Sequence, residues 1–265
     1  MAFPEFPAAD NRATRLALAR EDGCVVASPA RTGRSAGRKI REHPLPKSDK
    51  PARPQPDKPA RRSRAESREQ AINQIVDVAT QEFVEKGLAG ARIDEIAGRA
   101  TKRKIYYYFE GKEELYRAVL ERAYKRVRES EGTVDIDAGS AADALRRLIE
   151  HEVHYHCEHP ELVRLVMNEN IHRAEHLKQI PGLPENNRRV IDRLEHILAR
   201  GVAEGSFRKG IDPVELHLNM TALAFYNVSN QFTFAHNFDF DMTSEAAIER
   251  RAKQVADIVL AWVTQ

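Results

Sequence analysis

Residues 93–115 read IDEIAGRATKRKIYYYFEGKEEL, a segment in which apolar residues at helical spacing alternate with cations and phenols. The spacing predicts two short helices, 93–100 and 103–109, joined by a tight turn. Ile105 and Phe109 are four residues apart, so they lie on one face of the second helix. A longer helix, about 68–86, precedes this pair, and another begins at Lys112. This layout is typical of a helix-turn-helix domain.

The short helix that follows Ala100 carries cations and phenols on its other faces. Such groups hydrogen-bond phosphate oxygens and base edges, so one side of the helix would face a DNA major groove. The candidate DNA-binding residues in this helix are Thr101, Lys102, Arg103, Lys104, Tyr106 and Tyr107. The alternative is a solvated basic helix whose aromatic residues lie in the core.

From Ser67 onward apolar residues recur at spacings of three and four, without sustained alternation, which predicts an all-α chain. Gly87 stands where a left-handed residue would end the first helix. The helix from Lys112 extends to about Ser130. Five longer helices are expected after it, at 143–157, 160–178, 185–204, 213–234 and 244–263. The expected folded domains are therefore a helix-turn-helix unit, 67–112, and a larger helical domain, 113–265.

Residues 1–66 differ in composition from the rest of the chain. They hold nine of the thirteen prolines and 15 Lys or Arg against 8 Asp or Glu, whereas the remainder has 27 basic and 32 acidic residues. Such a segment cannot bury enough apolar area to offset its ordering entropy. We therefore expect a disordered, basic, Pro- and Arg-rich tail, which either adds non-specific affinity for phosphates or is only solvated.

Composition excludes several classes of protein. Two cysteines, Cys24 and Cys157, exclude a disulfide scaffold and fit a reducing cytoplasm. The sequence has no apolar run of about 18 residues or more and no signal-peptide pattern, so we expect a soluble protein that is not exported and has no membrane partner. No Gly-rich phosphate loop, nucleophile elbow or paired catalytic carboxylate motif is present, so neither an enzyme nor a cofactor is expected.

The stretch from Ile72 to Leu115 resembles the DNA-binding region of TetR-type repressors. The likeness rests on Phe83, Gly87, Ile93, Ile96-Ala97, Ile105-Tyr106-Tyr107-Tyr108-Phe109 and Lys112-Glu113. The resemblance implies that the helix from Thr101 is the recognition helix and that Tyr107 and Lys112 hold phosphates. The start of the Lys112 helix would point at the DNA backbone, and the partial positive charge of a helix N-terminus favours the same role.

Two positions depart from the usual family pattern. The chain between Ile96 and Phe109 is about two residues shorter than usual, a difference that would rotate a helix by roughly 200°. Arg92 stands where the family often has Thr. It is either a phosphate contact or an ordinary exposed arginine.

The resemblance also implies double-stranded operator DNA as partner, a ligand cavity in the second domain, and a homodimer through the last two helices. The last helix gives separate support, because it is apolar on more than one side and needs cover on each. Its main stripe consists of Ile248, Ala252, Val255, Val259 and Trp262. A buried core helix in a monomer is the alternative.

Amides and phenols among bulky apolar residues predict a pocket for a small planar or acidic effector, an aromatic or heterocyclic metabolite such as an aromatic carboxylate or a nucleobase. The candidate ligand-binding residues are Tyr155, Met167, Asn168, Ile171, His172, Phe225, Tyr226 and Asn230. For each of them the alternative is an ordinary core or surface group.

Six histidines lie between positions 151 and 176, and His172 and His176 have the spacing that lets two imidazoles of one helix face one metal. The competing hypothesis is therefore a helical metal- or metabolite-binding protein, or an enzyme, that has lost DNA binding. The cations and phenols around Arg103 favour a ligand-responsive repressor instead. Such a repressor would bind a palindromic operator as a dimer and be released by a small molecule.

Overall fold

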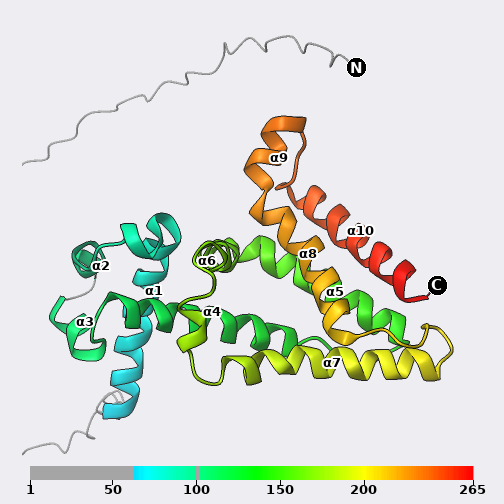
Figure 1. Ribbon diagram of the computed structural model, residues 1–265, viewed down its shortest axis with the longest axis horizontal. Coiled ribbons are helices and arrows are strands. Elements are labelled where there is room, and N and C mark those ends of the chain that lie inside the picture. Colours follow the sequence, from blue (N-terminus) through cyan, green and yellow to red (C-terminus); the bar gives the residue numbers. More distant parts are fainter. Residues whose placement is uncertain (1–62, 100–101, 265) are drawn as a thin grey trace, which may run out of the picture. The chain divides into compact units, whose positions relative to one another are not determined.

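The computed structural model of the chain describes residues 63–99 and 102–264. Every regular element in these ranges is a helix (Figure 1), which confirms the expected all-α class. The expected basic tail, 1–66, lies outside the described residues except for its last four positions. None of the helices in the described part of the chain combines the length and the hydropathy that a membrane span requires.

The N-terminal unit is built from α1 (Arg64–Gly90), α2 (Ile93–Arg99), α3 (Lys102–Tyr108) and α4 (Lys112–Gly132). Helix α1 begins before the expected start at about residue 68, because Ser63 and Glu66 form a capping box in which each side chain accepts the other's backbone N–H. Gly87 has a φ of +63°, as expected for a residue that interrupts the helix. A last turn to Gly90 nevertheless follows it.

The C-terminal unit follows after a connection from residue 133 to 140. Its elements are α5 (Ala141–Glu158), α6 (Pro160–Ile171), the 3₁₀ turn η1 (Leu177–Gln179), α7 (Leu183–Ala203), α8 (Pro213–Ser229), α9 (Gln231–Phe238) and α10 (Glu245–Thr264). Pro160 and Pro213 are the first residues of their helices, where a missing backbone N–H costs no hydrogen bond.

The expected helix 160–178 is wrong beyond Ile171. Arg173 and Ala174 have φ angles of 57° and 58°, which an α-helix does not allow. The buried Glu169 carboxylate accepts the backbone N–H groups of His176 and Leu177, each at 3.1 Å, so these groups are satisfied without a continuing helix. A side chain from the preceding turn therefore ends α6.

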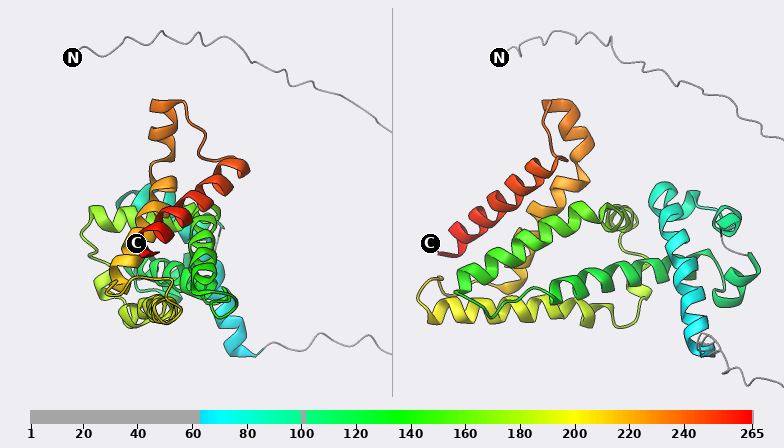
Figure 2. Two further views of the ribbon diagram at one scale, coloured as in Figure 1. Left: turned by 90° about the vertical axis from the view of Figure 1, so that its right-hand side faces the viewer. Right: turned by 180° about the vertical axis from the view of Figure 1, so that it is seen from behind.

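The expected helix 213–234 is also wrong, because it is interrupted at Asn230. That residue has φ −112° and ψ 5°, outside the helical region, and separates α8 from α9. Helix α9 ends at Asp239, which is left-handed with φ 46°. Figures 1 and 2 show α9 at the far end of α8, where it projects beyond the other helices.

Two groups of buried apolar residues form the cores of the two units. The first contains Phe83, Ile105 and Tyr116 of the N-terminal unit, together with Leu165 of α6 and Leu183 of α7. The second is made by α5, α7, α8 and α10. Helices of the C-terminal unit thus contribute directly to the core of the N-terminal unit, and the two are not joined by a bare linker.

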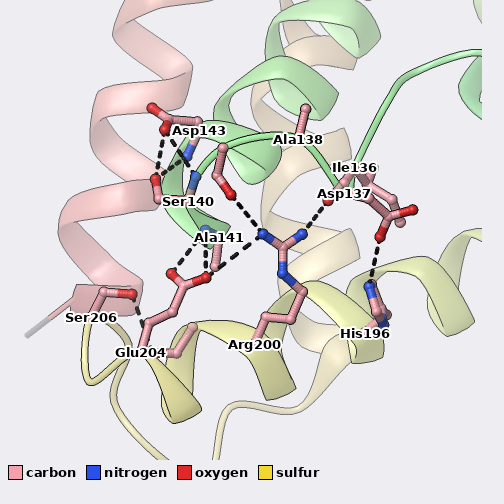
Figure 3. Close-up of polar contacts among 12 residues, drawn as sticks. Ile136, Asp137, Ala138, Ser140, Ala141, Asp143, His196, Arg200, Glu204 and Ser206 are labelled. Atoms are coloured by element: carbon pink, nitrogen blue, oxygen red, sulfur yellow. Dashed lines mark hydrogen bonds and ion pairs between the residues drawn. The ribbon is translucent and has the colours of Figure 1, made fainter.

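A polar cluster fastens the connection before α5 to α7 (Figure 3). Arg200 donates to the backbone carbonyl oxygens of Ile136 and Gly139, the second at 2.8 Å. Glu204 accepts the backbone N–H of Ala141 at 2.9 Å and pairs with Arg200 at 3.6 Å. These contacts satisfy backbone groups of a segment that has no regular structure of its own.

Replacing Arg200 with Met should lower the free energy of unfolding by about 1–3 kcal/mol, because two carbonyls lose their donor and Glu204 loses its cation. Arg188→Met is the control, since Arg188 on the same helix makes only exposed ion pairs with Asp192 and Glu195. It should cost less than about 0.5 kcal/mol. Urea unfolding at one protein concentration measures both variants, and equal losses would refute the role given to Arg200.

Candidate DNA-binding surface and ligand pocket

Helix α3 has one buried and one exposed face. Ile105 and Phe109 are buried in the core of the N-terminal unit, as their spacing predicts. Arg103 and Lys104 are exposed, and Tyr106 and Tyr107 are 55% and 75% exposed. The residues that can bind phosphates or base edges therefore lie together on the outside of a helix held from its inner side.

Tyr108 differs from the two tyrosines before it, because it packs against α1. The Arg68 guanidinium lies 5.9 Å from the centre of the Tyr108 ring, and the Tyr107 and Tyr108 rings meet edge to face at 4.9 Å. Tyr108 is partly buried against the core of the N-terminal unit, whereas Tyr107 stays exposed.

Lys112 stands at the start of α4 and reaches back to α1. Its Nζ donates to the carbonyl oxygens of Ala89 and Ala91, at 3.5 and 3.3 Å. The N-cap residue Gly111 has no side chain that could accept the first N–H groups of α4. Lys112 thus binds the end of α1 to the start of α4 beside a helix N-terminus, a place that favours anions.

The other candidate DNA-binding residues have different positions. Arg92 is exposed, and its backbone N–H donates to Glu82 at 3.3 Å. Thr101 and the side chain of Lys102 lie outside the described residues, as does the turn between α2 and α3. Helix α2 ends at Arg99 and α3 begins at Lys102, and the short turn stays a prediction.

A cavity of about 330 Å³ lies among α4, α5, α6, α7 and α8. Its walls combine apolar and aromatic side chains with buried polar ones. The lining residues are Tyr124, Val127, Arg128, Glu152, His156, Leu162, Val166, Asn187, Ile191, His217, Thr221 and Phe225. A mainly apolar cavity with a few convergent polar groups is the usual form of a small-molecule site, and we refer to it as the ligand pocket.

Burial sets the charge state of the titratable groups in the ligand pocket. Desolvation raises the pKa of Glu152 to about 7, although the Thr221 hydroxyl donates to it at 2.6 Å. Desolvation, and then the Arg128 charge, lower the pKa values of His156 and His217 to about 4. At neutral pH both imidazoles are therefore uncharged, and Glu152 is balanced between its two forms.

Three polar atoms of the lining have no hydrogen-bond partner among the described residues, namely Arg128 Nε, His156 Nδ1 and Asn187 Oδ1. The backbone carbonyl of Glu152, one turn earlier on α5, acts to raise the pKa of His156, against the larger lowering by burial and by Arg128. Buried polar atoms normally have partners. A bound molecule would supply them here.

The structure does not bring the eight predicted ligand-binding residues to one cavity. Phe225 lines the ligand pocket, whereas Tyr155 lines a groove of about 680 Å³ beside Arg122 and Tyr226 lines a cavity of about 440 Å³ beside α10. The remaining five lie elsewhere. Met167, Ile171 and His172 are exposed, Asn168 lies beside Gly87, and Asn230 donates to the hydroxyl of Ser229.

Sequence reasoning missed most of the polar groups of the ligand pocket: Arg128, Glu152, His156, Asn187, His217 and Thr221. One signal was present. Glu152 and His156 continue the apolar stripe of α5 that contains Leu145, Leu148 and Ile149, and a charged residue on such a stripe is buried with it.

The histidines do not form a metal site in the part of the chain that the structure describes, where no group of three or more His, Cys, Asp or Glu side chains could hold an ion. His176 Nδ1 pairs with Glu169 at 3.1 Å, and His172 caps α6. His151 instead contacts the Ser130 hydroxyl at 2.9 Å.

Two family models match the chain in the two units just described. The model described as bacterial regulatory proteins, tetR family, matches residues 75–119, and the model described as tetracyclin repressor-like, C-terminal domain, matches residues 142–259. The chain belongs to the TetR family of transcriptional regulators. The resemblance of the segment Ile72–Leu115 is thereby confirmed.

Individual relatives agree with this membership. The HTH-type transcriptional repressor NicS from Pseudomonas putida is 28% identical over 199 residues, which cover 74% of this chain and 94% of that protein. The HTH-type transcriptional repressor SCO4008 from Streptomyces coelicolor is 39% identical over 99 residues, 37% of this chain and 48% of that protein.

Solved structures show the same fold. A tetR-family regulatory protein from Rhodococcus RHA1 superposes with a TM-score of 0.58 at 20% identity, over 73% of this chain and 97% of that one. The regulator FadR from Bacillus subtilis, in complex with stearoyl-CoA, superposes with a TM-score of 0.56 at 18% identity, over 72% of this chain and 98% of that one. At these identities the likeness concerns the fold alone.

In this TetR-family chain α6 connects the ligand pocket with the DNA-binding unit. Leu162 lines the pocket, whereas Leu165 is fully buried in the core of the N-terminal unit. At the end of α6, Glu169 pairs with His176, and the His176 ring meets the Tyr116 ring of α4 edge to face at 5.2 Å. Burial and the nearby Glu169 carboxylate raise the pKa of Tyr116.

The Glu169→Gln variant should unfold with a free energy about 1.5–3 kcal/mol lower than the unmodified chain, because an amide NH₂ cannot accept all the N–H groups that the buried carboxylate accepts. Glu175→Gln is the control, since Glu175 is exposed on the same connection, and its effect should stay below about 0.5 kcal/mol. If urea unfolding finds the two variants alike, Glu169 does not hold α6 to its neighbours.

Glu152 should make stability depend on pH in a known direction. Its pKa, about 7 in the folded protein, exceeds the ordinary value of 4.5. The stability that its protonated form contributes is therefore complete below pH 4.5 and is lost as pH rises through 7. From pH 5 to pH 8 the free energy of unfolding of the unmodified chain should fall by about 2–3 kcal/mol more than that of Glu152→Gln.

Urea unfolding of both proteins at pH 5 and pH 8, at one protein concentration, measures this difference. If the free energies of unfolding of the two proteins differ by the same amount at both pH values, Glu152 is not strongly desolvated.

Proposed function

We propose that this chain is a ligand-responsive repressor that binds a palindromic operator as a homodimer and releases it when a small molecule occupies the ligand pocket. The observation that carries the proposal is the exposed cationic and phenolic face of α3, above the buried pair Ile105 and Phe109. An enzyme or a metabolite carrier would have no use for such a face. Because the partner is DNA, we place the protein in the cytoplasm.

The dimer is proposed to form through α8 and α10, the helices on either side of α9. On α8, Val214, Leu218 and Tyr226 are exposed at intervals of four or eight residues and so form one stripe, and Ile258 is exposed on α10. The inner face of α10, with Val255 and Val259, is buried against its own domain. Exposed apolar stripes of this kind support a self-complementary interface between two copies.

The proposed switch is a shift between two populated arrangements of the dimer. A molecule in the ligand pocket contacts the second half of α4 and one face of α6, and both helices also pack in the core of the N-terminal unit. Two recognition helices must match half-sites about 34–36 Å apart, so a displacement of a few ångströms weakens both contacts at once.

Replacing Lys112 with Ala should weaken binding to every DNA sequence and lower the salt dependence of binding, by about one released ion per subunit, because a phosphate contact is lost. Arg103→Ala should instead reduce the preference for the operator over unrelated DNA. Lys125→Ala, on the exposed side of α4, is the control for the loss of one positive charge.

Footprinting on the DNA upstream of the protein's own gene would first locate the site, and fluorescence anisotropy titrations at several salt concentrations would follow. If all three variants lose the same affinity for DNA, with the preference for the operator and the salt dependence unchanged, the roles assigned to Lys112 and Arg103 are wrong. An intact dimer that ignores this DNA at low salt would sink the proposed function.

A further inference from the structure

The charged and titratable groups around the ligand pocket come from four helices. They are Tyr124, Arg128 and Glu131 on α4, Glu152 and His156 on α5, Arg193 on α7, and His217 on α8. Helix α6 contributes only the apolar side chains of Leu162 and Val166 to the lining. The sign of charge that the pocket prefers follows from how these groups are paired.

Positive charge exceeds negative charge in this set. Arg128 donates to Glu131 at 2.7 Å, and Arg193 also acts on the same carboxylate, so two guanidinium groups face one acid whose own pKa is raised to about 7 by burial. Glu152 is the only carboxylate among the lining residues, and it is held half-neutral at pH 7 by desolvation.

The two imidazoles report the same positive potential. Desolvation is the larger cause of the lowered pKa values of His156 and His217, and the Arg128 charge lowers both further, so Arg128 repels a proton placed on either ring. A potential that repels a proton attracts an anion. The Nε of Arg128 has no hydrogen-bond partner in the part of the chain that the structure describes, although the side chain is only 10% exposed.

The volume and the lining of the pocket limit the size and shape of a ligand beyond its charged group. A volume of about 330 Å³ is near the lower end of the range for ligand sites, about 300–1,000 Å³, and suits one or two rings. Tyr124 and Phe225 line the pocket, and Phe225 meets the His156 ring edge to face at 6.0 Å. Aromatic walls of this kind favour a planar, unsaturated ligand.

We propose that the ligand pocket takes a small aromatic carboxylate, received at Arg128 and His156, and that this anion binds together with one proton that the protein takes up from solvent on Glu152. The proposal rests on the proposed function only in treating this pocket as the effector site. Asn187, whose side-chain oxygen has no partner among the described residues, would bind a polar substituent on the ring.

Uptake of a proton is expected because Glu152 lines the same pocket as the bound anion. An anion close to an ionised Glu152 would be repelled, so only the protonated form binds it well. With a pKa of about 7, the protonated fraction of Glu152 falls about tenfold between pH 6 and pH 8. A carboxylic acid with a pKa near about 4 stays ionised over this range, so any change in affinity comes from the protein.

The test uses three probes of nearly equal shape and different charge, namely benzoate, benzamide and benzamidinium, in calorimetric titrations of the whole chain without DNA. Benzoate should bind with a dissociation constant at least about tenfold lower than either of the others, since one unpaired charge contact is worth that factor. Its dissociation constant should rise about tenfold from pH 6 to pH 8.

Two buffers of different ionisation enthalpy should show the uptake of a proton with benzoate, approaching one per site at pH 8. In Glu152→Gln, which is neutral at every pH, the change in affinity with pH should become several-fold smaller, and what remains should come from Glu131, the Arg128 partner whose pKa is also raised to about 7. In Asn187→Asp, which adds a negative charge without changing shape, benzoate should bind at least about tenfold more weakly.

Asn186→Asp is the matched control, because Asn186 directly precedes Asn187 on α7 but does not line the pocket. It should bind benzoate as the unmodified chain does. Thermal melts establish that each variant is folded, and if Asn187→Asp unfolds, the pH series of Glu152→Gln decides alone.

Tighter binding of benzamidinium or benzamide, no detectable binding of benzoate at millimolar concentration, or an affinity for benzoate that does not change with pH would each overturn the proposal. These titrations contain no DNA. A protein that binds benzoate as described but does not bind its operator would refute the proposed repressor and leave the proposed pocket chemistry intact. A protein that binds its operator but not benzoate would refute the pocket chemistry and leave the repressor intact.

Discussion

A single helix, α4, is built into both halves of the molecule. Tyr116 and Leu120 of its first half are buried in the core of the DNA-binding unit, and Val127 and Arg128 of its second half line the ligand pocket. A helix of 21 residues is a stiff rod about 32 Å long. Because it cannot shorten or bend cheaply, a change of packing at the pocket must be carried to the start of the helix, where Lys112 holds the end of α1.

Helix α6 gives the two halves a second shared contact. Leu162 faces the pocket and Leu165 faces the core of the DNA-binding unit, so the helix cannot move for one without disturbing the other. Glu169 then fixes its end to the turn at His176. Three buried polar atoms of the ligand pocket have no hydrogen-bond partner among the described residues, and an unpaired buried polar atom costs free energy. A ligand that pairs them stabilises whichever arrangement of α4 and α6 allows the best contacts.

Local pattern predicted the DNA-binding unit well, because its helices depend on near neighbours in the sequence. The four-residue spacing of Ile105 and Phe109 places one face of α3 in the core. The start of α1 was nevertheless expected about four residues too late, although its capping box of Ser63 and Glu66 is also a local signal. The ligand pocket was not predicted, because its polar groups come from helices far apart in the chain and only packing brings Arg128 to His217. The end of α6 was missed for the same reason. The Glu169 carboxylate replaces helical hydrogen bonds that periodicity cannot show to be absent.

Coupling between two sites is reciprocal, so the most direct measurement compares one affinity in two states of the protein. Benzoate is titrated calorimetrically into the free dimer and into the dimer saturated with its operator, at the same pH and salt. Benzoate should bind about five- to a hundredfold more weakly to the DNA complex, the usual range of such coupling. Equal affinity in the two states would refute the proposed switch, because a molecule that binds both states equally well cannot release the operator.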